Sequence, residues 1–307
     1  DVSVCNNSSY TTTTASVQYA TNFAWSTPDG TGILTSNAND TVAIYTPADD
    51  ESGIVTLVLT AQSNGSCTEV VTDEILLTIN AAPTADAGAD QTLCASTNEV
   101  VLSGNVTNEA SFVWTANLAD GSAGSGTFTP DNDVNTTYNP SPTDIASGSV
   151  TLNLTAVGLD GCVDATDSMI VIFAPQPIVN AGTDAFICEG ESYDLTNSSP
   201  SYLHGVSPEW TIIGGDGNFS GNINSNILEP VYTPGPQDII DGTVTLRLTL
   251  DPIDPCSDPI SDDVVIEITQ APTVSVVPNF DICESSFTVT GTTVQNEGLI
   301  EWSIVCL

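Results

Sequence analysis

The stretch that decides the fold is GTVTLRLTL, residues 242–250, which has two earlier variants, GIVTLVLTA at 53–61 and GSVTLNLTA at 148–156. After the opening glycine, apolar residues alternate with mostly polar ones, which is the period of a β-strand with one buried face. The residues predicted to face a core are Val55, Leu57, Leu59, Val150, Leu152, Leu154, Val244, Leu246 and Leu248. Three copies of one strand predict three copies of one folding module.

Other landmarks recur in a fixed order around this strand, with a period of 89 to 95 residues. A cysteine ends a short run at the start of each repeat, at Cys5, Cys94, Cys188 and Cys283. A tryptophan follows 19 to 22 residues later, at Trp25, Trp114, Trp210 and Trp302. A second cysteine follows the glycine-led strand, at Cys67, Cys162 and Cys256. Such a period is typical of a tandem array.

Ala-Pro pairs at 82–83, 174–175 and 271–272 mark the joins between repeats. Proline fixes φ and lacks an N–H, so each join is expected to be extended and stiff. The predicted repeats are an N-terminally truncated first one, two complete ones and the start of a fourth, at 1–81, 82–174, 175–270 and 271–307. We therefore interpret the sequence as a window on a longer array.

The composition of each repeat predicts an all-β fold. The repeats are rich in Thr, Val, Ile, Ser and Asn, and Gly, Pro, Asn or Asp interrupts them every 8 to 12 residues. This pattern is typical of short antiparallel strands in a β-sandwich. The four tryptophans are predicted to be core residues; stacking against a ligand is the alternative.

The eight cysteines indicate disulfides. They include no C-x-x-C pair, and the sequence has a single histidine, His204, so zinc is the weaker alternative. Disulfides place the protein outside the cytosol. We predict one bridge within each module: Cys5–Cys67, Cys94–Cys162 and Cys188–Cys256. Cys283 is expected to pair beyond the sequence, and Cys306 either pairs with Cys283 or is an end effect.

The charge is strongly one-sided, with 39 acidic residues, one basic residue and a formal net charge of −38. This argues against nucleic acid and anionic membranes as partners, because both require clustered Lys and Arg. No apolar run approaches the roughly 20 residues that cross a bilayer. The single cation, Arg247, alternates outward on its strand, where an exposed salt bridge to an acid across the sheet would contribute little.

The sequence contains no catalytic or nucleotide-binding motif, and its single histidine, His204, lies in a predicted loop without a partner motif. We therefore predict that the protein is not an enzyme. No organic cofactor is expected. Calcium is the open possibility, because oxygen-rich turns could supply hard ligands. The candidates are Asp131, Asp133, Asp251, Asp254 and Asp258. The alternative is that these acids only solvate the surface.

The landmark order resembles the PKD-like or immunoglobulin-like repeats of very large surface adhesins of Bacteroidota, of the gliding-adhesin SprB type. The residues that carry the resemblance are AGADQTLC, TYNPSPTDIASGSVTLNLTAVGLDGC and YTPGPQDIIDGTVTLRLTLDPIDPC. The resemblance implies type IX secretion and attachment outside the outer membrane. It also implies O-glycosylation of D-[ST]-apolar tripeptides, which Thr41 and Ser168 match; the alternative is that both are only exposed strand residues.

The sequence therefore predicts structural stalk repeats of a long secreted adhesin that serves surface adhesion or gliding motility. Its partners would be neighbouring repeats, and, through regions outside this window, outer-membrane or motility machinery and an external surface or glycan. Two alternatives remain open. The modules could form a laterally packed extracellular filament, or they could be glycan- or protein-binding accessory modules of a secreted enzyme.

Overall fold

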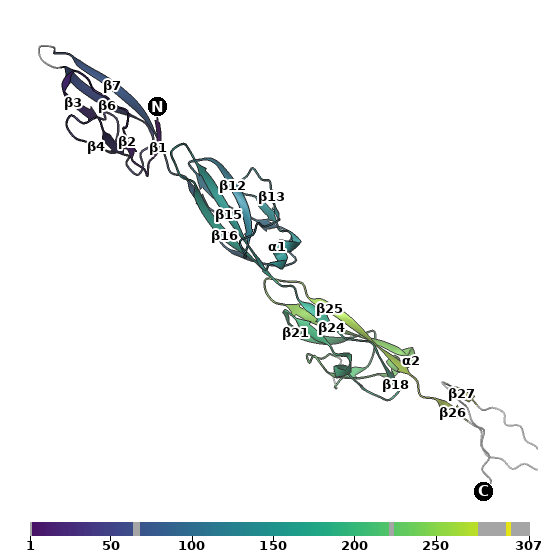
Figure 1. Ribbon diagram of the computed structural model, residues 1–307. Coiled ribbons are helices and arrows are strands. Elements are labelled where there is room, and N and C mark those ends of the chain that lie inside the picture. Colours follow the sequence, from purple (N-terminus) through teal and green to yellow (C-terminus); the bar gives the residue numbers. More distant parts are fainter. Residues whose placement is uncertain (1, 64–67, 221–223, 276–292, 296–307) are drawn as a thin grey trace, which may run out of the picture. The chain divides into compact units, whose positions relative to one another are not determined.

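The computed structural model describes residues 2–63, 68–220, 224–275 and 293–295. The chain divides into two compact units, Asp1–Ala174 and Pro175–Leu307, which are treated separately below. The first unit contains two β-sandwiches, which we call module one (2–80) and module two (84–174); the second contains module three (178–269). The prediction of an all-β tandem array of Ig-like sandwich modules is confirmed (Figure 1).

Module one has two facing sheets. The larger has the order β1-β7-β6-β3 and the smaller the order β2-β5-β4. The bounds are β1 Val2–Cys5, β2 Tyr10–Thr11, β3 Ala20–Ser26, β4 Ile33–Ser36, β5 Ala43–Thr46, β6 Gly53–Ser63 and β7 Val70–Asn80.

Module two repeats this plan with sheets β12-β15-β16-β9 and β10-β14-β13, and adds a two-stranded pair, β11-β8. The bounds are β8 Thr84–Asp86, β9 Gln91–Cys94, β10 Val100–Val101, β11 Asn105–Thr107, β12 Glu109–Leu118, β13 Thr127–Thr129, β14 Thr137–Asn139, α1 Pro142–Ala146, β15 Ser149–Gly158 and β16 Ala165–Ala174. In Figure 1, β12, β15 and β16 run side by side along this module.

Module three has sheets β18-β25-β24-β21 and β19-β23-β22, with the extra pair β17-β20. The bounds are β17 Ile178–Asn180, β18 Ala185–Cys188, β19 Tyr193–Asp194, β20 Ser201–Leu203, β21 Gly205–Ile213, β22 Asn218–Phe219, β23 Val231–Thr233, α2 Pro236–Asp241, β24 Thr243–Pro252 and β25 Ile260–Thr269, with a 3-10 turn at Leu195–Ser198. Beyond this module, β26 Thr273–Ser275 pairs with β27 Thr293–Gln295.

The glycine-led strands β6, β15 and β24 supply the centre of each core, as the alternation predicts. Their inward apolar residues are all buried, with Leu57, Leu152 and Leu246 fully so. Trp25, Trp114 and Trp210 are buried beside them. Each indole N–H donates to a backbone carbonyl, for example from Trp210 to Leu228 at 2.8 Å, so the buried ring keeps its hydrogen bond. Trp302 lies outside the described residues.

Two short helices were not predicted. In α1, Pro142 occupies the first turn and Ser141 caps the helix, because its hydroxyl accepts from the Asp144 N–H while Asp144 accepts from the Ser141 N–H. The Asp144 carboxylate also accepts a hydrogen bond from the buried Tyr138 hydroxyl at 2.8 Å. In α2, Asp238 binds the Tyr232 hydroxyl in the same way.

The first cysteine-bearing strand of each module departs from the predicted antiparallel arrangement. β1 runs parallel to β7, β9 to β16 and β18 to β25, each along the edge of its sheet. In module one this places Cys5 opposite Asn80, the last residue of β7. In each module the cysteine-bearing strand and the last strand therefore finish at the same end of the sheet, which is the end next to the following repeat.

Arg247 lies on the outward face of β24, as predicted. Its Nε and one terminal nitrogen donate to the two carboxylate oxygens of Asp263 at 2.7 and 2.8 Å. Asp263 lies directly opposite on β25. The two side chains are 42% and 37% exposed, so the ion pair is a surface contact of small energetic value.

Candidate functional site at the join between modules one and two

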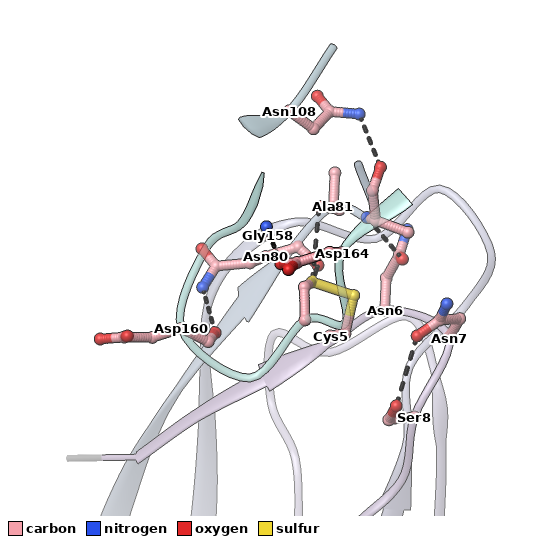
Figure 2. Close-up of a disulfide and its surroundings, with 12 residues drawn as sticks. Cys5, Asn6, Asn7, Ser8, Asn80, Ala81, Asn108, Gly158, Asp160 and Asp164 are labelled. Carbon is pink, nitrogen blue, oxygen red and sulfur yellow. Dashed lines mark hydrogen bonds between the residues drawn. A yellow bond between two sulfur atoms is a disulfide. The ribbon is translucent and has the colours of Figure 1, made fainter. Parts of the chain in front are cut away.

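A disulfide crosses the join between the first two modules. Cys5, at the end of β1 in module one, is bonded to Cys162, in the turn between β15 and β16 of module two; their Cα atoms are 4.6 Å apart and 157 residues apart in sequence (Figure 2). Cys5 is 1% exposed, so its half of the disulfide is buried. Two sandwiches are thus joined by a covalent bond as well as by the backbone.

The predicted bridges Cys5–Cys67 and Cys94–Cys162 are therefore wrong, and so is the expectation of one bridge inside each module. Module two shows the reason. Cys94 lies opposite Ala174 at the end of β16, whereas Cys162 precedes the start of that strand at Ala165. The nine residue steps from Ala165 to Ala174 span about 30 Å along the strand. Cys94 and Cys162 therefore lie at opposite ends of β16, much farther apart than the roughly 7 Å that a disulfide allows between Cα atoms.

The third predicted bridge, Cys188–Cys256, is also wrong. Cys188 carries a free, exposed thiol, while Cys256 is disulfide-bonded. Cys94 is disulfide-bonded as well. Cys67, Cys283 and Cys306 lie outside the described residues.

Polar contacts surround the bridge on both sides of the join. The Asn6 N–H donates to the Asn80 carbonyl at 2.9 Å, and Asn6 Oδ1 accepts from the Ala82 N–H at 3.1 Å. The Asn80 side chain then donates to the Asp160 carbonyl of module two at 2.7 Å, a contact visible in Figure 2. These asparagines satisfy backbone groups that the turn from one sandwich to the next would leave unpaired.

Module two meets the join through two further residues. The Asn108 side chain donates to the Ala82 carbonyl at 3.0 Å, which holds the chain just before Pro83. Gly161 has φ +86°, and a Cβ atom there would lie 2.8 Å from the Cα of Val4. Glycine is therefore required for the turn of Cys162 to approach β1.

Module three has, at its C-terminal end, hydrogen bonds equivalent to those that Asn6 makes at the join. The Glu189 N–H donates to the Thr269 carbonyl at 2.9 Å, as Asn6 does to Asn80. The Glu189 carboxylate accepts from the Ala271 N–H at 2.9 Å, the role that Asn6 Oδ1 has toward Ala82. The residue after Cys188 therefore makes the same two hydrogen bonds as the residue after Cys5, although Cys188 is exposed and Cys5 is buried.

The described part of the chain does not gather the remaining candidate residues into one cluster. No group of three or more His, Cys, Asp or Glu side chains that could hold a metal occurs within the described ranges. Calcium binding by Asp131, Asp133, Asp251, Asp254 or Asp258 stays a prediction, which melting curves with and without EDTA can decide. Ser168 is exposed on β16 and Thr41 is half-buried, so glycosylation also stays a prediction. No described helix is long and apolar enough to cross a membrane.

Comparison with known proteins gives structural similarities only. No family model matches the sequence, and no curated protein matches it. Among solved structures, the titin fragment I67–I69 aligns at 12% identity over 88% of this chain and 95% of that fragment, with a TM-score of 0.47. Human CDH23 EC21–23 aligns at 10% identity over 86% and 96%, with a TM-score of 0.42. Because these scores are below 0.5, the fold assignment rests on the sheets described above.

Proposed function

We propose that the chain is part of the stalk of a long secreted surface adhesin, with repeats at 1–81, 82–174, 175–270 and 271–307, and that the stalk serves surface adhesion or gliding. The observation that carries this proposal is the Cys5–Cys162 bond between modules. A stalk must transmit tension from one module to the next. A covalent bond beside the backbone link does so without relying on the hydrogen bonds of the join.

The disulfides and the large negative charge of the chain support an extracellular role. Disulfides form and persist outside the reducing cytosol. A net charge of −38 keeps long acidic molecules apart in solution and disfavours lateral packing. Secretion by the type IX system and attachment outside the outer membrane belong to this proposal, as do motility machinery and an external surface or glycan as partners of other regions.

The test is electron microscopy of source cells labelled with antibodies raised against this chain. The stalk hypothesis expects label along separate threads at the cell surface. Regular lateral packing of labelled modules would instead support the filament alternative. Specific binding of the purified chain to a glycan array would favour the accessory-module alternative.

A further inference from the structure

β12 forms one edge of the larger sheet of module two, so its two sides have different partners. Its inner side pairs with β15. Along an antiparallel strand, the N–H and C=O groups of alternate residues point to the same side. On the outer side, the Ala116 carbonyl accepts from the Gly124 N–H at 2.9 Å. The Leu118 N–H likewise donates to the Ser122 carbonyl at 2.8 Å. The even-numbered residues of β12 therefore point their backbone groups outward from the sheet edge.

Phe112 and Trp114 belong to this outward set. The register between β12 and β15 is unbroken from Ser111 to Leu118, so the alternation holds over the whole stretch. Among the residues that the structure describes, the backbone N–H and C=O groups of Phe112 and Trp114 have no hydrogen-bond partner. The turn at 119–124 thus covers one end of the edge, and residues 112–114 form an open segment beside it.

The matching edges of the other two modules are covered at this place. In module one, Asn39 Oδ1 accepts from the Phe23 N–H at 2.9 Å, and the Asn39 N–H donates to the Phe23 carbonyl at 3.2 Å. In module three, the N–H and the C=O of Trp210 both pair with the backbone of Ser225, at 2.7 and 3.1 Å. Loop residues therefore occupy backbone groups that module two leaves open.

The side chains along the open segment also lack the features that keep edge strands apart. In module three, Pro208 removes a backbone donor and Glu209 places a charge directly before the core tryptophan. Proline and charged residues at such positions are common means of protecting a sheet edge. In β12, residues 111–117 contain neither proline nor a charged residue, and Val113 takes the position of Glu209. The Val113 side chain is 46% exposed.

The open segment is complementary to a second copy of itself. When two β12 strands run antiparallel with their Val113 residues opposite each other, Phe112 of each strand stands opposite Trp114 of the other. Each such pair exchanges two N–H···O=C bonds, so all of the open donors and acceptors are satisfied. The contact has two-fold symmetry and closes on itself, so it joins two chains and does not propagate.

We propose that the outer edge of β12 is a self-association site, at which a second copy of this chain pairs antiparallel with residues 112–114. The larger sheets of the two copies then form one continuous sheet. Main-chain bonds supply the affinity, and the small area of a single strand edge, compared with roughly 800 Å² per partner in stable complexes, keeps the pair weak and reversible. This inference goes beyond the stalk proposal and does not depend on it.

Charge explains both the location of the site and its response to salt. Two chains with a net charge of −38 repel each other, so an uncharged stretch is where they can approach closely. Carboxylates flank this stretch: the Trp114 indole donates to the Val134 carbonyl at 3.0 Å, and the loop of Val134 carries Asp131 and Asp133. Added salt screens their repulsion and should therefore strengthen pairing.

The experiment is sedimentation equilibrium of the full chain from about 10 μM to about 1 mM, a range suited to a weak pair. The chain carries Cys188→Ser, which excludes dimers linked through that thiol. We expect a monomer–dimer equilibrium that shifts toward the dimer as salt is raised. Hydrogen exchange at low and high protein concentration locates the contact. The amides of Phe112 and Trp114 should exchange more slowly in the dimer, and that of Trp210 should keep its rate.

Three variants provide matched comparisons, with melting curves to verify folding. Val113→Glu places like charges directly opposite each other across the contact and should weaken dimerisation at least about fivefold. Ala24→Glu adds the same charge at the equivalent position of module one, where Asn39 covers the edge, and should leave the dimerisation constant unchanged. Val113→Thr keeps a neutral β-branched side chain and should retain the dimer.

Three results would each overturn the proposal. The first is a chain that stays monomeric at every concentration and salt. The second is a dimer that Val113→Glu and Ala24→Glu weaken equally, which would mean that only total charge matters. The third is a dimer in which the amides of Phe112 and Trp114 gain no protection, which would place the contact elsewhere.

Discussion

The hydroxyl of Tyr45 donates to the carboxylate of Glu51, with both oxygen distances at 2.8 Å, in the interior of module one. Tyr45 is 0% exposed and Glu51 8%. The same carboxylate accepts from the N–H groups of Thr31 at 2.6 Å and Ala48 at 3.1 Å. A tyrosine and an acid six residues later form this contact in all three modules, so it is part of the folding plan of the repeat.

Tyr45→Phe should lower the free energy of unfolding of module one by about 1 to 3 kcal/mol, because it leaves a buried carboxylate with one partner fewer. Tyr19, which is 89% exposed, provides the control within the same module. Tyr19→Phe should change stability by less than about 0.5 kcal/mol. Denaturant unfolding measures both, and equal effects would contradict a special role for the Tyr45 hydroxyl.

Acid should weaken this contact. Burial alone would raise the pKa of Glu51, but hydrogen bonds from Thr31, Tyr45 and Ala48 outweigh it and lower that pKa in the folded protein. The resulting stabilisation is present above the unfolded pKa of about 4.3 and is lost as pH falls through the lower folded value. Low pH also relieves repulsion among the acids, so the relevant quantity is the stability difference between wild type and Glu51→Gln. We expect it to shrink between about pH 5 and pH 2.

The bridge across the join predicts a specific peptide map. Digestion without reduction should yield Cys5 linked to Cys162, and a Cys5–Cys67 fragment would contradict the structure. Cys162→Ser should destabilise the first unit by up to about 5 kcal/mol, the chain-entropy value for a loop of this length. Cys188→Ser is the matched control and should leave that unit unchanged.

The Cys188 thiol should be alkylated by iodoacetamide in the folded protein, because it is free and exposed. Cys5 and Cys162 should remain unmodified until the protein is reduced. Mass spectrometry of the native and the reduced chain reads out both states. A native chain in which Cys188 resists the reagent would show that the thiol is blocked.

Arg247→Gln should leave the denaturant midpoint of unfolding unchanged within experimental error, since its ion pair with Asp263 is exposed. Asp263→Asn should have an effect of similar size, and the effect of either substitution should shrink as salt is added. A clear fall in the midpoint would mean that the arginine has a role beyond this pair.

The sequence predicts the centre of each module well, because alternation along β6, β15 and β24 reports directly which side chains face a core. It also contains a signal for α1 that our interpretation missed, the Ser-Pro-Thr-Asp run at 141–144, which is a capping box with proline in the first turn.

The Cys5–Cys162 bond could not be predicted from such an alternation of apolar and polar residues. A four-residue strand such as Gln91–Cys94 shows the same alternation whether it pairs parallel or antiparallel. Only its direction decides which end of the module the cysteine reaches.

The position of the Cys5–Cys162 bond has a consequence for damage to the chain. Nearly the whole of modules one and two lies within the covalent ring that this bond closes. A single cut in the backbone anywhere inside that ring opens the ring but leaves both fragments attached to one another. An extracellular protease that nicks an exposed loop once therefore does not sever the molecule there, and separation requires a second event, either another cut or reduction of the sulfur bond.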